Sequence, residues 1–502
     1  MTRALPGLLT GALVLVLTVG TVIITAAHAG ATTGLQPADW AALRFTLWQA
    51  ALSALLSVAL AVPAARALAR RRFPGKRALV LLLGAPFILP VIVAVFGLIA
   101  VFGRGGLVNT VLAAVGVPPI SIYGLHGVVL AHVFFNLPLA VRLILQGWLA
   151  IPAEQFRLAA TLNLPIVKHI EWPMLRRVLP GVAMAIFLIC LTSFAVALTL
   201  GGGPRATTLE LAIYQALRFD FDLGRAALLA MLQFAVCLAA ALAAWWVTPP
   251  DLAQRGLDRT VMRWDRAPLW VDAAVLVLVS LFLLLPLGAV VMRGVPGLAE
   301  MPASVWPAAA RSLVIALLST LLCVVMALSL GLRRGPVPTM IGALPLATSS
   351  LVMATGLFLL VFRVLSPATV AVPVTILTNA VLALPFALRS LAPEISALRA
   401  NYDKLAATLG LSGWLYLRWL VLPRLRRPLA FAAGLAAALS MGDLGAIAIF
   451  ADQTNPTLPL VMYRLIAAYQ MTAAAGVGVL LLSLTLLVFW IIDRGGRHDV
   501  DA

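Results

Sequence analysis

Long apolar runs, separated by short polar segments, occupy most of this chain of 502 residues. A helix needs about 20 apolar residues to cross the hydrocarbon core of a bilayer. The chain is 63% hydrophobic and 11% charged, whereas soluble domains carry about 25% charged residues. We therefore expect an all-α polytopic membrane protein with about 12 transmembrane helices, surrounded by membrane lipid. The predicted spans lie near 7–29, 43–65, 79–102, 124–147, 178–200, 224–247, 269–292, 309–332, 338–362, 368–390, 428–450 and 471–492.

Basic residues are distributed unevenly between the alternate loops. One set of loops, together with the tail from 493, holds 24 of the 36 lysines and arginines, and the other set holds six. The positive-inside rule places the first set and both termini in the cytoplasm. Because the bases lie in short loops between spans, the formal net charge of +18 does not indicate nucleic-acid binding. The first apolar run is longer than the usual core of a signal peptide, so we expect it to be retained as a span.

The sequence offers no catalytic or metal-binding cluster. The three cysteines all lie inside apolar segments, where they are expected to pack as small hydrophobic residues. The five histidines show no ligand spacing. We expect no metal, no bound cofactor and no enzymatic activity in this chain.

The two parts of the chain repeat one another in the same direction. Leu158-Ala159-Ala160-Thr161-Leu162 recurs letter for letter as Leu405-Ala406-Ala407-Thr408-Leu409. Three further pairs lie around it: Thr46 with Ser312, Ser193 with Ser440 (each 33 residues after the second alanine of its copy), and the stretch from Thr208 with that from Thr457. We predict two tandem halves of six spans, residues 1–250 and 251–502, related by an axis along the membrane normal.

Each copy of the repeated segment lies in a cytoplasmic loop, at 151–177 and at 391–427, between the fourth and fifth spans of its half. Alanine and leucine favour helix, and small alanines let another protein approach closely. Gly410 follows the second helix at the position where glycine commonly ends one. One such segment is compatible with an amphipathic connector on the bilayer surface. Two at equivalent positions favour a shared docking role.

These twin segments resemble the coupling loop, or EAA loop, of ATP-binding-cassette (ABC) importer permeases. That resemblance implies docking onto a separate cytoplasmic ATPase dimer, which uses the ATP. The implied coupling residues are Leu158, Ala159, Ala160, Asn163 and Pro173 in the first loop, and Leu405, Ala406, Ala407, Gly410 and Pro423 in the second.

The coupling loops depart from that family pattern at three points. The acidic residue that opens the loop is replaced by Arg157 and Lys404, and Asn163 stands where glycine is expected. The first loop is also three residues shorter between this position and its proline. Asparagine adopts the left-handed conformation, so we expect the turn to persist, with weaker docking of the first loop.

Two further stretches resemble the thiamine branch of the fused permeases, in which one chain supplies both halves. They are 198–217, which contains Gly201-Gly202-Gly203-Pro204, and 439–460, which contains Gly442-Asp443. The resemblance implies a multi-pass protein of the bacterial inner membrane that moves thiamine or its phosphates, delivered by a periplasmic thiamine-binding protein. Fused permeases for iron(III) or polyamines, and ion-coupled secondary transporters, are the alternatives.

Six residues are candidates for the translocation path: Ser193, Gly202, Tyr214, Ser440, Asp443 and Tyr463. Intramembrane carboxylates usually face a bundle interior or a water-filled cavity. Asp443 is therefore a candidate contact for the cationic thiazolium of thiamine, with a helix cap as the alternative. The two tyrosines are expected either at a gate or as interfacial aromatic residues.

Overall fold

The computed structural model describes residues 5–29, 34–201, 203–247, 269–451 and 455–497. These residues form helices and no strand, as the sequence predicts. The expected boundary near residue 250 and Gly202 both lie outside the described residues. Eleven helices are long and apolar enough to cross a membrane, and a bent pair, Val337–Ala347 with Ser350–Val361, brings the number to 12. The expectation of about 12 transmembrane helices is confirmed.

The helices follow the same order in the two halves. The first half contains α1 (Leu5–Leu15), α2 (Thr21–Ala29), α3 (Pro37–Arg70), α4 (Lys76–Leu82), α5 (Val91–Phe102), α6 (Leu107–Ala114), α7 (Leu125–Leu149), α8 (Ala153–Thr161), α9 (Trp172–Leu191), α10 (Ala195–Leu200), α11 (Leu209–Arg218) and α12 (Leu223–Val247). The second contains α13 (Leu269–Gly297), α14 (Val305–Gly331), α15 (Pro336–Ala343), α16 (Ser350–Val361), α17 (Ala371–Thr408), α18 (Gly413–Tyr416), α19 (Leu422–Arg424), α20 (Arg426–Gly442), α21 (Gly445–Phe450), α22 (Leu458–Ala467) and α23 (Met471–Arg497).

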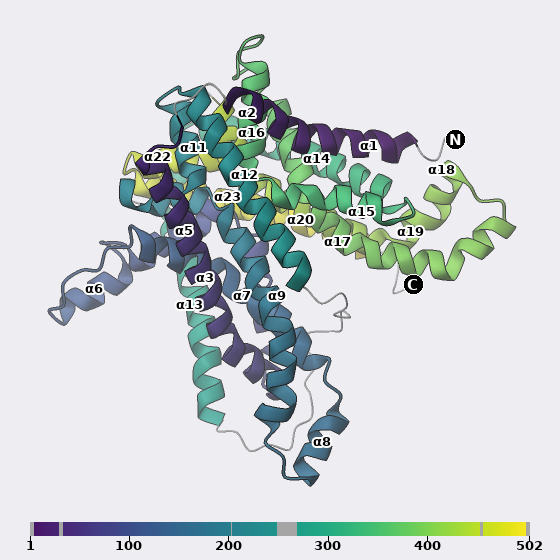
Figure 1. Ribbon diagram of the computed structural model, residues 1–502. Helices are drawn as coiled ribbons and strands as arrows, with labels where there is room; N and C mark the ends of the chain where they lie inside the picture. Colours follow the sequence, from purple (N-terminus) through teal and green to yellow (C-terminus); the bar gives the residue numbers. More distant parts are fainter. Residues whose placement is uncertain (1–4, 30–33, 202, 248–268, 452–454, 498–502) are drawn as a thin grey trace.

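The helices form two diverging arms that meet at one end (Figure 1). The first arm comprises α3, α7, α9 and α13, and the second comprises α14, α17, α20 and α1. We call the shared end, where α11, α16 and α22 lie, the apex. The helix that opens each half packs on the other half: α13 lies against α3 and α5, and α1 and α2 lie against α14, α15 and α16. Each arm is therefore completed by a helix from the opposite half.

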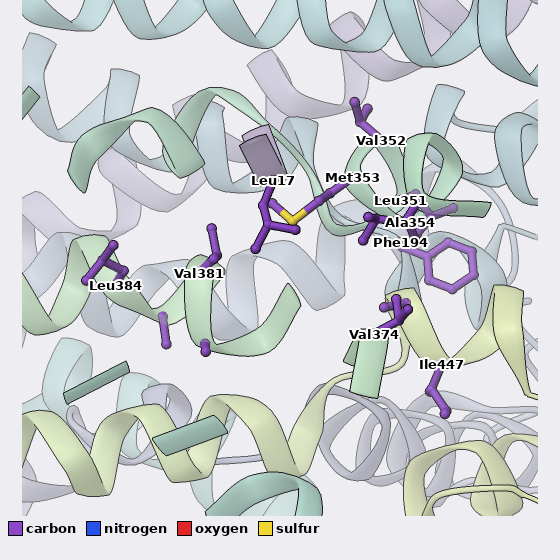
Figure 2. Packing of buried hydrophobic residues seen from close by; sticks show 14 of the residues in the cluster. Leu17, Phe194, Leu351, Val352, Met353, Ala354, Val374, Val381, Leu384 and Ile447 are labelled. Carbon is purple, nitrogen blue, oxygen red and sulfur yellow. The ribbon is translucent and has the colours of Figure 1, made fainter. Parts of the chain in front are cut away.

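Buried apolar side chains join the two halves near the apex. Figure 2 shows Leu17, which follows α1, beside Met353 of α16, with Phe194 of the first half in the same cluster. All three side chains are at most 5% exposed. Because apolar burial is the dominant favourable term in packing, this cluster holds the opening helix of the first half on the second.

Three predicted spans differ in detail from the observed helices. The span at 79–102 is interrupted before α5, whose N-cap is Pro90. The span at 338–362 bends by 89° before α16. In the second half, α17 continues without a break from the fourth span into the repeated segment, whereas the first half ends α7 at Leu149 and restarts at α8. The first half has Pro152 at this junction, which disfavours helix in the preceding residue; Arg399 is its counterpart in α17.

Candidate functional site

The repeated segment is helical in both halves and lies at the far end of each arm. The first copy forms the last turn of α8, and the second forms the last turn of α17. Figure 1 shows α8 and α18, which closely follows α17, at the two ends most distant from the apex. The described ends of the chain share this side of the protein, because α1 packs beside Arg333 and α23 ends beside Arg426. The cytoplasmic placement of the termini and of both coupling loops stays a prediction.

The two helices end in the same hydrogen-bonded cap. Asn163 has φ 49° and Gly410 has φ 65°, both in the left-handed region. Leu164 N–H donates to Ala159 O at 2.8 Å, and Leu411 N–H donates to Ala406 O at 2.9 Å. This bonding is the Schellman motif. The predicted left-handed conformation of Asn163 is confirmed, and the cap supplies no reason for weaker docking of the first loop.

The outward faces of the two helices are also alike. Ala159 and Ala406 are buried at 3% and 4% exposure, so they hold each helix to its arm. The first and last leucines of each repeated segment are more than half exposed: Leu158, Leu162, Leu405 and Leu409. Ala160 and Ala407 lie exposed beside them. Exposed apolar patches of this kind are typical of surfaces that bind a partner, so the docking role expected of both segments stays a prediction.

Both loops return to the membrane through a turn of π-helix. These turns, Val167–Glu171 and Leu417–Val421, lie 250 positions apart and are followed by Pro173 and Pro423 near the start of the next helix. The residues before each proline are already helical, so each proline lies in a continuing helix, where a local π-helical adjustment re-satisfies the freed backbone groups. The two prolines therefore mark equivalent points in the halves.

The fifth span of each half is broken at an equivalent point. The break separates α9 from α10 around Ser193 and α20 from α21 around Asp443, again 250 positions apart. The pairing of Ser193 with Ser440 expected from counting is wrong. Three additional residues in the second loop shift the register, so Ser193 corresponds to Asp443 and Ser440 corresponds to Cys190. The correction places Asp443 in an irregular break, where backbone groups lack helical partners.

Asp443 lies where the two halves meet. A Cβ atom on Gly442 would approach Pro90 of the first half to 3.0 Å, and one on Gly445 would clash with Ser350 Oγ. Asp443 Oδ1 accepts a hydrogen bond from Gly445 N–H at 3.2 Å, which caps α21. Oδ2 has no hydrogen-bond partner among the described residues. The carboxylate therefore caps a helix with one oxygen and retains the other for a further contact.

Ser440 lies one turn earlier and is used within the bundle. Its hydroxyl accepts a hydrogen bond from Asn379 Nδ2 of α17 at 3.0 Å, and both residues are buried. This bond joins the fourth and fifth spans of the second half. The contact identifies a packing role for Ser440 in this conformation.

Tyr214 and Tyr463 lie in the short apical helices α11 and α22. Tyr214 packs against Phe194 with ring centroids 5.3 Å apart and is 7% exposed. Tyr463 packs against the buried apolar cluster that contains Tyr214, and burial raises the pKa of Tyr463. Arg218 at the end of α11 donates to Ala451 O at 2.7 Å across the halves. The apex is closed by these contacts, which favours a gate position for the tyrosines.

Paired residues from the sequence repeat hold these apical helices in the same way. Thr46 Oγ1 accepts a hydrogen bond from Leu209 N–H at 2.9 Å, and Ser312 Oγ accepts one from Leu458 N–H at 2.8 Å. Each hydroxyl satisfies one of the N–H groups that lack partners at a helix start. The pairs Thr46 with Leu209 and Ser312 with Leu458 thus form the same hydrogen bond in each half.

Glu210 is an apical carboxylate that is not among the candidate residues identified from the sequence. It lies in α11, outside the candidate spans, and is 0% exposed. Neither carboxylate oxygen has a partner of good hydrogen-bond geometry among the described residues. Burial raises the pKa of Glu210 to about 8, partly offset by the Ser349 and Gln233 side chains. In the sequence, Glu210 directly follows Thr208-Leu209, and the equivalent position of the second half is Pro459. This difference between the halves is the feature that could have identified Glu210.

An apolar groove of about 740 Å³ lies on the flank of the first arm, between α3, α7 and α13. Its lining is almost wholly aliphatic and aromatic, including Leu56, Val133 and Phe282. Apart from His126, its lining carries no titratable side chain, so the groove suits an apolar ligand such as a lipid chain. Within the described residues, no three histidine, cysteine or carboxylate side chains gather as a metal site.

Similarity to known proteins extends over nearly the whole chain. No family model matches it. The chain is 42% identical over 479 residues to the thiamine transport system permease protein ThiP of Escherichia coli (strain K12), which covers 91% of this chain and 89% of that protein. The protein of the same name from Salmonella typhimurium is 42% identical over 484 residues, covering 91% and 90%. That of Brucella abortus (strain 2308) is 37% identical over 482 residues, covering 92% and 89%.

The similarity to these permeases and the candidate membrane spans indicate the same cellular location and the same class of protein. Eleven apolar helices of spanning length, together with permease relatives aligned from end to end, make the protein a multi-pass component of the bacterial inner membrane. The resemblance inferred from the coupling loops and from the 198–217 stretch is confirmed. The chain belongs to the family of thiamine transport system permease proteins.

Proposed function

We propose that this chain is the membrane-spanning subunit of an ABC importer that carries thiamine, or its phosphates, from a periplasmic binding protein to the cytoplasm. The observation that carries the proposal is the end-to-end identity of 42% with a thiamine permease. The identical caps and exposed leucines of the two docking helices support the ABC class independently. No covalent chemistry is assigned to this chain.

Energy enters through a separate ATPase dimer, with one subunit on each docking helix. The apolar patches at Leu158 and Leu405 lie at the ends of diverging arms. Closure of the dimer draws the two patches together and so brings the arms together. The closed apex and separated arms correspond to the state that opens toward the ATPase. Each state is favoured by its own contacts with ligand and nucleotide.

The cargo passes between the halves, beside the broken fifth spans. Ser193 and Asp443 mark those breaks, and Tyr214 and Tyr463 close the apical end of the same route. Thiamine carries a cationic thiazolium, and the unpartnered Oδ2 of Asp443 is an acceptor at the interface of the halves. Ser440 and Gly202 are assigned no separate contact with the cargo.

The rival class is a carrier driven by an ion gradient. Such carriers depend on intramembrane acids or histidines, whereas one oxygen of Asp443 already caps α21. A carrier also has no use for two matched docking helices. Iron(III) and polyamine importers share those helices, but the relatives aligned over the whole chain are thiamine permeases.

Uptake of labelled thiamine tests the proposal. Cells lacking their own thiamine permease receive this chain with its cognate ATPase and binding protein. Uptake is expected to require the ATPase, to persist when the proton gradient is collapsed while ATP is maintained, and to be insensitive to excess iron(III) or spermidine. Uptake that continues without the ATPase identifies a carrier instead.

A substitution on the docking surface tests the ABC assignment separately. Ala407 is exposed beside Leu405, so Ala407→Arg is expected to abolish co-purification of the ATPase while membrane insertion is retained. Undiminished co-purification contradicts the docking role. Ala327→Leu, at a buried position within α14, serves as the control for a general folding defect. It should lower the yield of folded permease, while the permease that does fold should still co-purify with the ATPase.

A further inference from the structure

An ion pair with a buried carboxylate ties the first docking loop to the first arm. Arg66 of α3 pairs with Glu171 at 2.9 Å, and Glu171 is 2% exposed. Trp148 of α7 donates its indole N–H to the same carboxylate at 3.2 Å. Glu171 is the last residue of the π-helical turn that follows α8. The loop that carries the docking helix is therefore bonded to two helices of its arm.

The same end of α3 is also tied to the opposite half. Arg70 and Arg71, about one turn beyond Arg66, both pair with Asp272 near the start of α13. Their Nε atoms lie 2.7 and 2.6 Å from Asp272 Oδ2, and the Asp272 side chain is 5% exposed. α13 belongs to the second half but lies along the first arm. α3 thus connects the first docking loop with a helix of the other half.

The second arm has apolar residues at all three positions of the first tie. The counterparts of Arg66, Trp148 and Glu171 are Leu332, Ile395 and Val421, given by the pairs Thr46 with Ser312, Pro138 with Pro385 and Pro173 with Pro423. These three residues belong to one apolar cluster. A Cβ atom on Gly331, the neighbour of Leu332, would lie 2.8 Å from Ile395 Cδ1. The apolar contact between the helices is preserved, and Arg399 of α17 also donates hydrogen bonds to Leu332 O and Arg333 O at the end of α14.

The acid–base pair of the second arm is exposed. Asp403 at the docking helix pairs with Arg334 at 2.9 Å, but the Arg334 side chain is 83% exposed. Exposed pairs of this kind contribute little to stability. No acid of α1 matches Asp272; at that place Gly7 lies against the Arg333 side chain. Among the described residues, buried acid–base ties at this end are found in the first arm.

We propose that Glu171 is a positioning residue that makes the first docking loop, α3 and α13 move as one body when the ATPase closes. The ion pair fixes one geometry because its charged atoms must stay in register. ATP-driven motion of the first loop then reaches the second half directly through α13. The proposal rests on the proposed function only in taking α8 as an ATPase contact.

Distance measurements between paired spin labels test this rigidity. The complex of permease and ATPase is placed in lipid nanodiscs, with the three buried cysteines replaced by alanine and retained ATPase activity confirmed. One label pair, Thr161→Cys with Trp270→Cys, reports on α8 and α13; the other, Thr408→Cys with Leu8→Cys, reports on the second docking helix and α1. Thr161, Trp270 and Leu8 are exposed. Distances are compared without nucleotide and with ATP plus vanadate.

We expect the first pair to keep one narrow distance in both states. The second pair serves as the reference for changes at the other docking helix that do not depend on Glu171. Glu171→Gln and Arg66→Met should each broaden the first distribution at least twofold, and the double variant should add nothing further. Asp403→Asn should leave both pairs unchanged. A first pair that shifts with nucleotide in the unsubstituted protein, or stays narrow in both variants, overturns the proposal.

Two readouts separate this inference from the proposed function. Broadening of the first pair by Glu171→Gln is measured without nucleotide or thiamine, so it reports on the tie alone. Failure of the ATPase to bind the unsubstituted permease refutes the proposed function and leaves that comparison intact. If Glu171→Gln lowers the amount of folded protein, Arg66→Met tests the same bond from its other side.

Discussion

The left-handed caps of the two docking helices allow a quantitative prediction about ATPase affinity. Gly410 has φ 65°, and a Cβ atom added to it would meet no atom within 4 Å, so Gly410→Ala introduces backbone strain and no clash. The left-handed conformation costs an alanine about 1 to 2 kcal/mol. Because the cap bonds Leu411 N–H to Ala406 O at 2.9 Å, this cost disorders the end of the helix that the ATPase contacts.

The expected result is a loss of affinity whose size follows from that strain. A cost of about 1 to 2 kcal/mol corresponds to a factor of about 5 to 30 in an equilibrium constant. We expect Gly410→Ala to raise the Kd for the ATPase by this factor. Asn163 already tolerates φ 49°, so Asn163→Ala should cost less, and Asn163→Gly should be neutral or slightly favourable.

The measurement is ATPase binding to the permease in nanodiscs, followed by biolayer interferometry without nucleotide. Gly75 provides the matched control, because its φ is 89° and no atom lies within 4 Å of an added Cβ. It lies in a different loop, so Gly75→Ala carries the same strain without touching the docking surface. An unchanged Kd for Gly410→Ala, or an equal loss for Gly75→Ala, refutes the reasoning.

Three further predictions concern other sites. Asp443→Asn keeps an oxygen for Gly445 N–H, so assembly should be normal while thiamine uptake falls; normal uptake kinetics contradict the path assignment. Asp272→Asn leaves two arginines without their buried partner and should cost about 3 kcal/mol, seen as a lower Tm than that of Asp403→Asn. Because the pKa of Glu210 is raised in the folded state, the folded protein keeps a proton that the unfolded protein loses. The stability from this proton is fully present below about pH 4.5 and is lost as the pH rises to about 8. Glu210→Gln should flatten the dependence of Tm on pH in this window, and an unchanged slope contradicts it.

Much of the protein follows from local sequence. Apolar runs of spanning length predict the helices because each span must satisfy its backbone hydrogen bonds internally. The identical five-residue segments predict two matching helices, because alanine and leucine favour helix. Even the conformation of Asn163 was predictable, since few residues other than glycine enter the left-handed region.

Counting along the chain failed where an insertion changed the register. The three additional residues in the second loop made Ser440 the expected partner of Ser193, whereas the helix break pairs Ser193 with Asp443. The sequence also gives no direct sign that α17 runs unbroken to Thr408, apart from the lack of a proline at the position of Pro152.

Hydrophobicity and helix preference within short segments are enough to predict the membrane class and the two helical copies of the repeated segment. Which charges meet depends instead on how the helices pack. Glu171 and Arg66 are 105 positions apart, and Arg70 and Asp272 are 202 apart. Ion pairs form between whichever groups the packed helices bring within a few ångströms, and no local pattern records that distance. The unequal ties of the two docking loops are therefore a property of the packed bundle, although the helices they hold are alike in sequence.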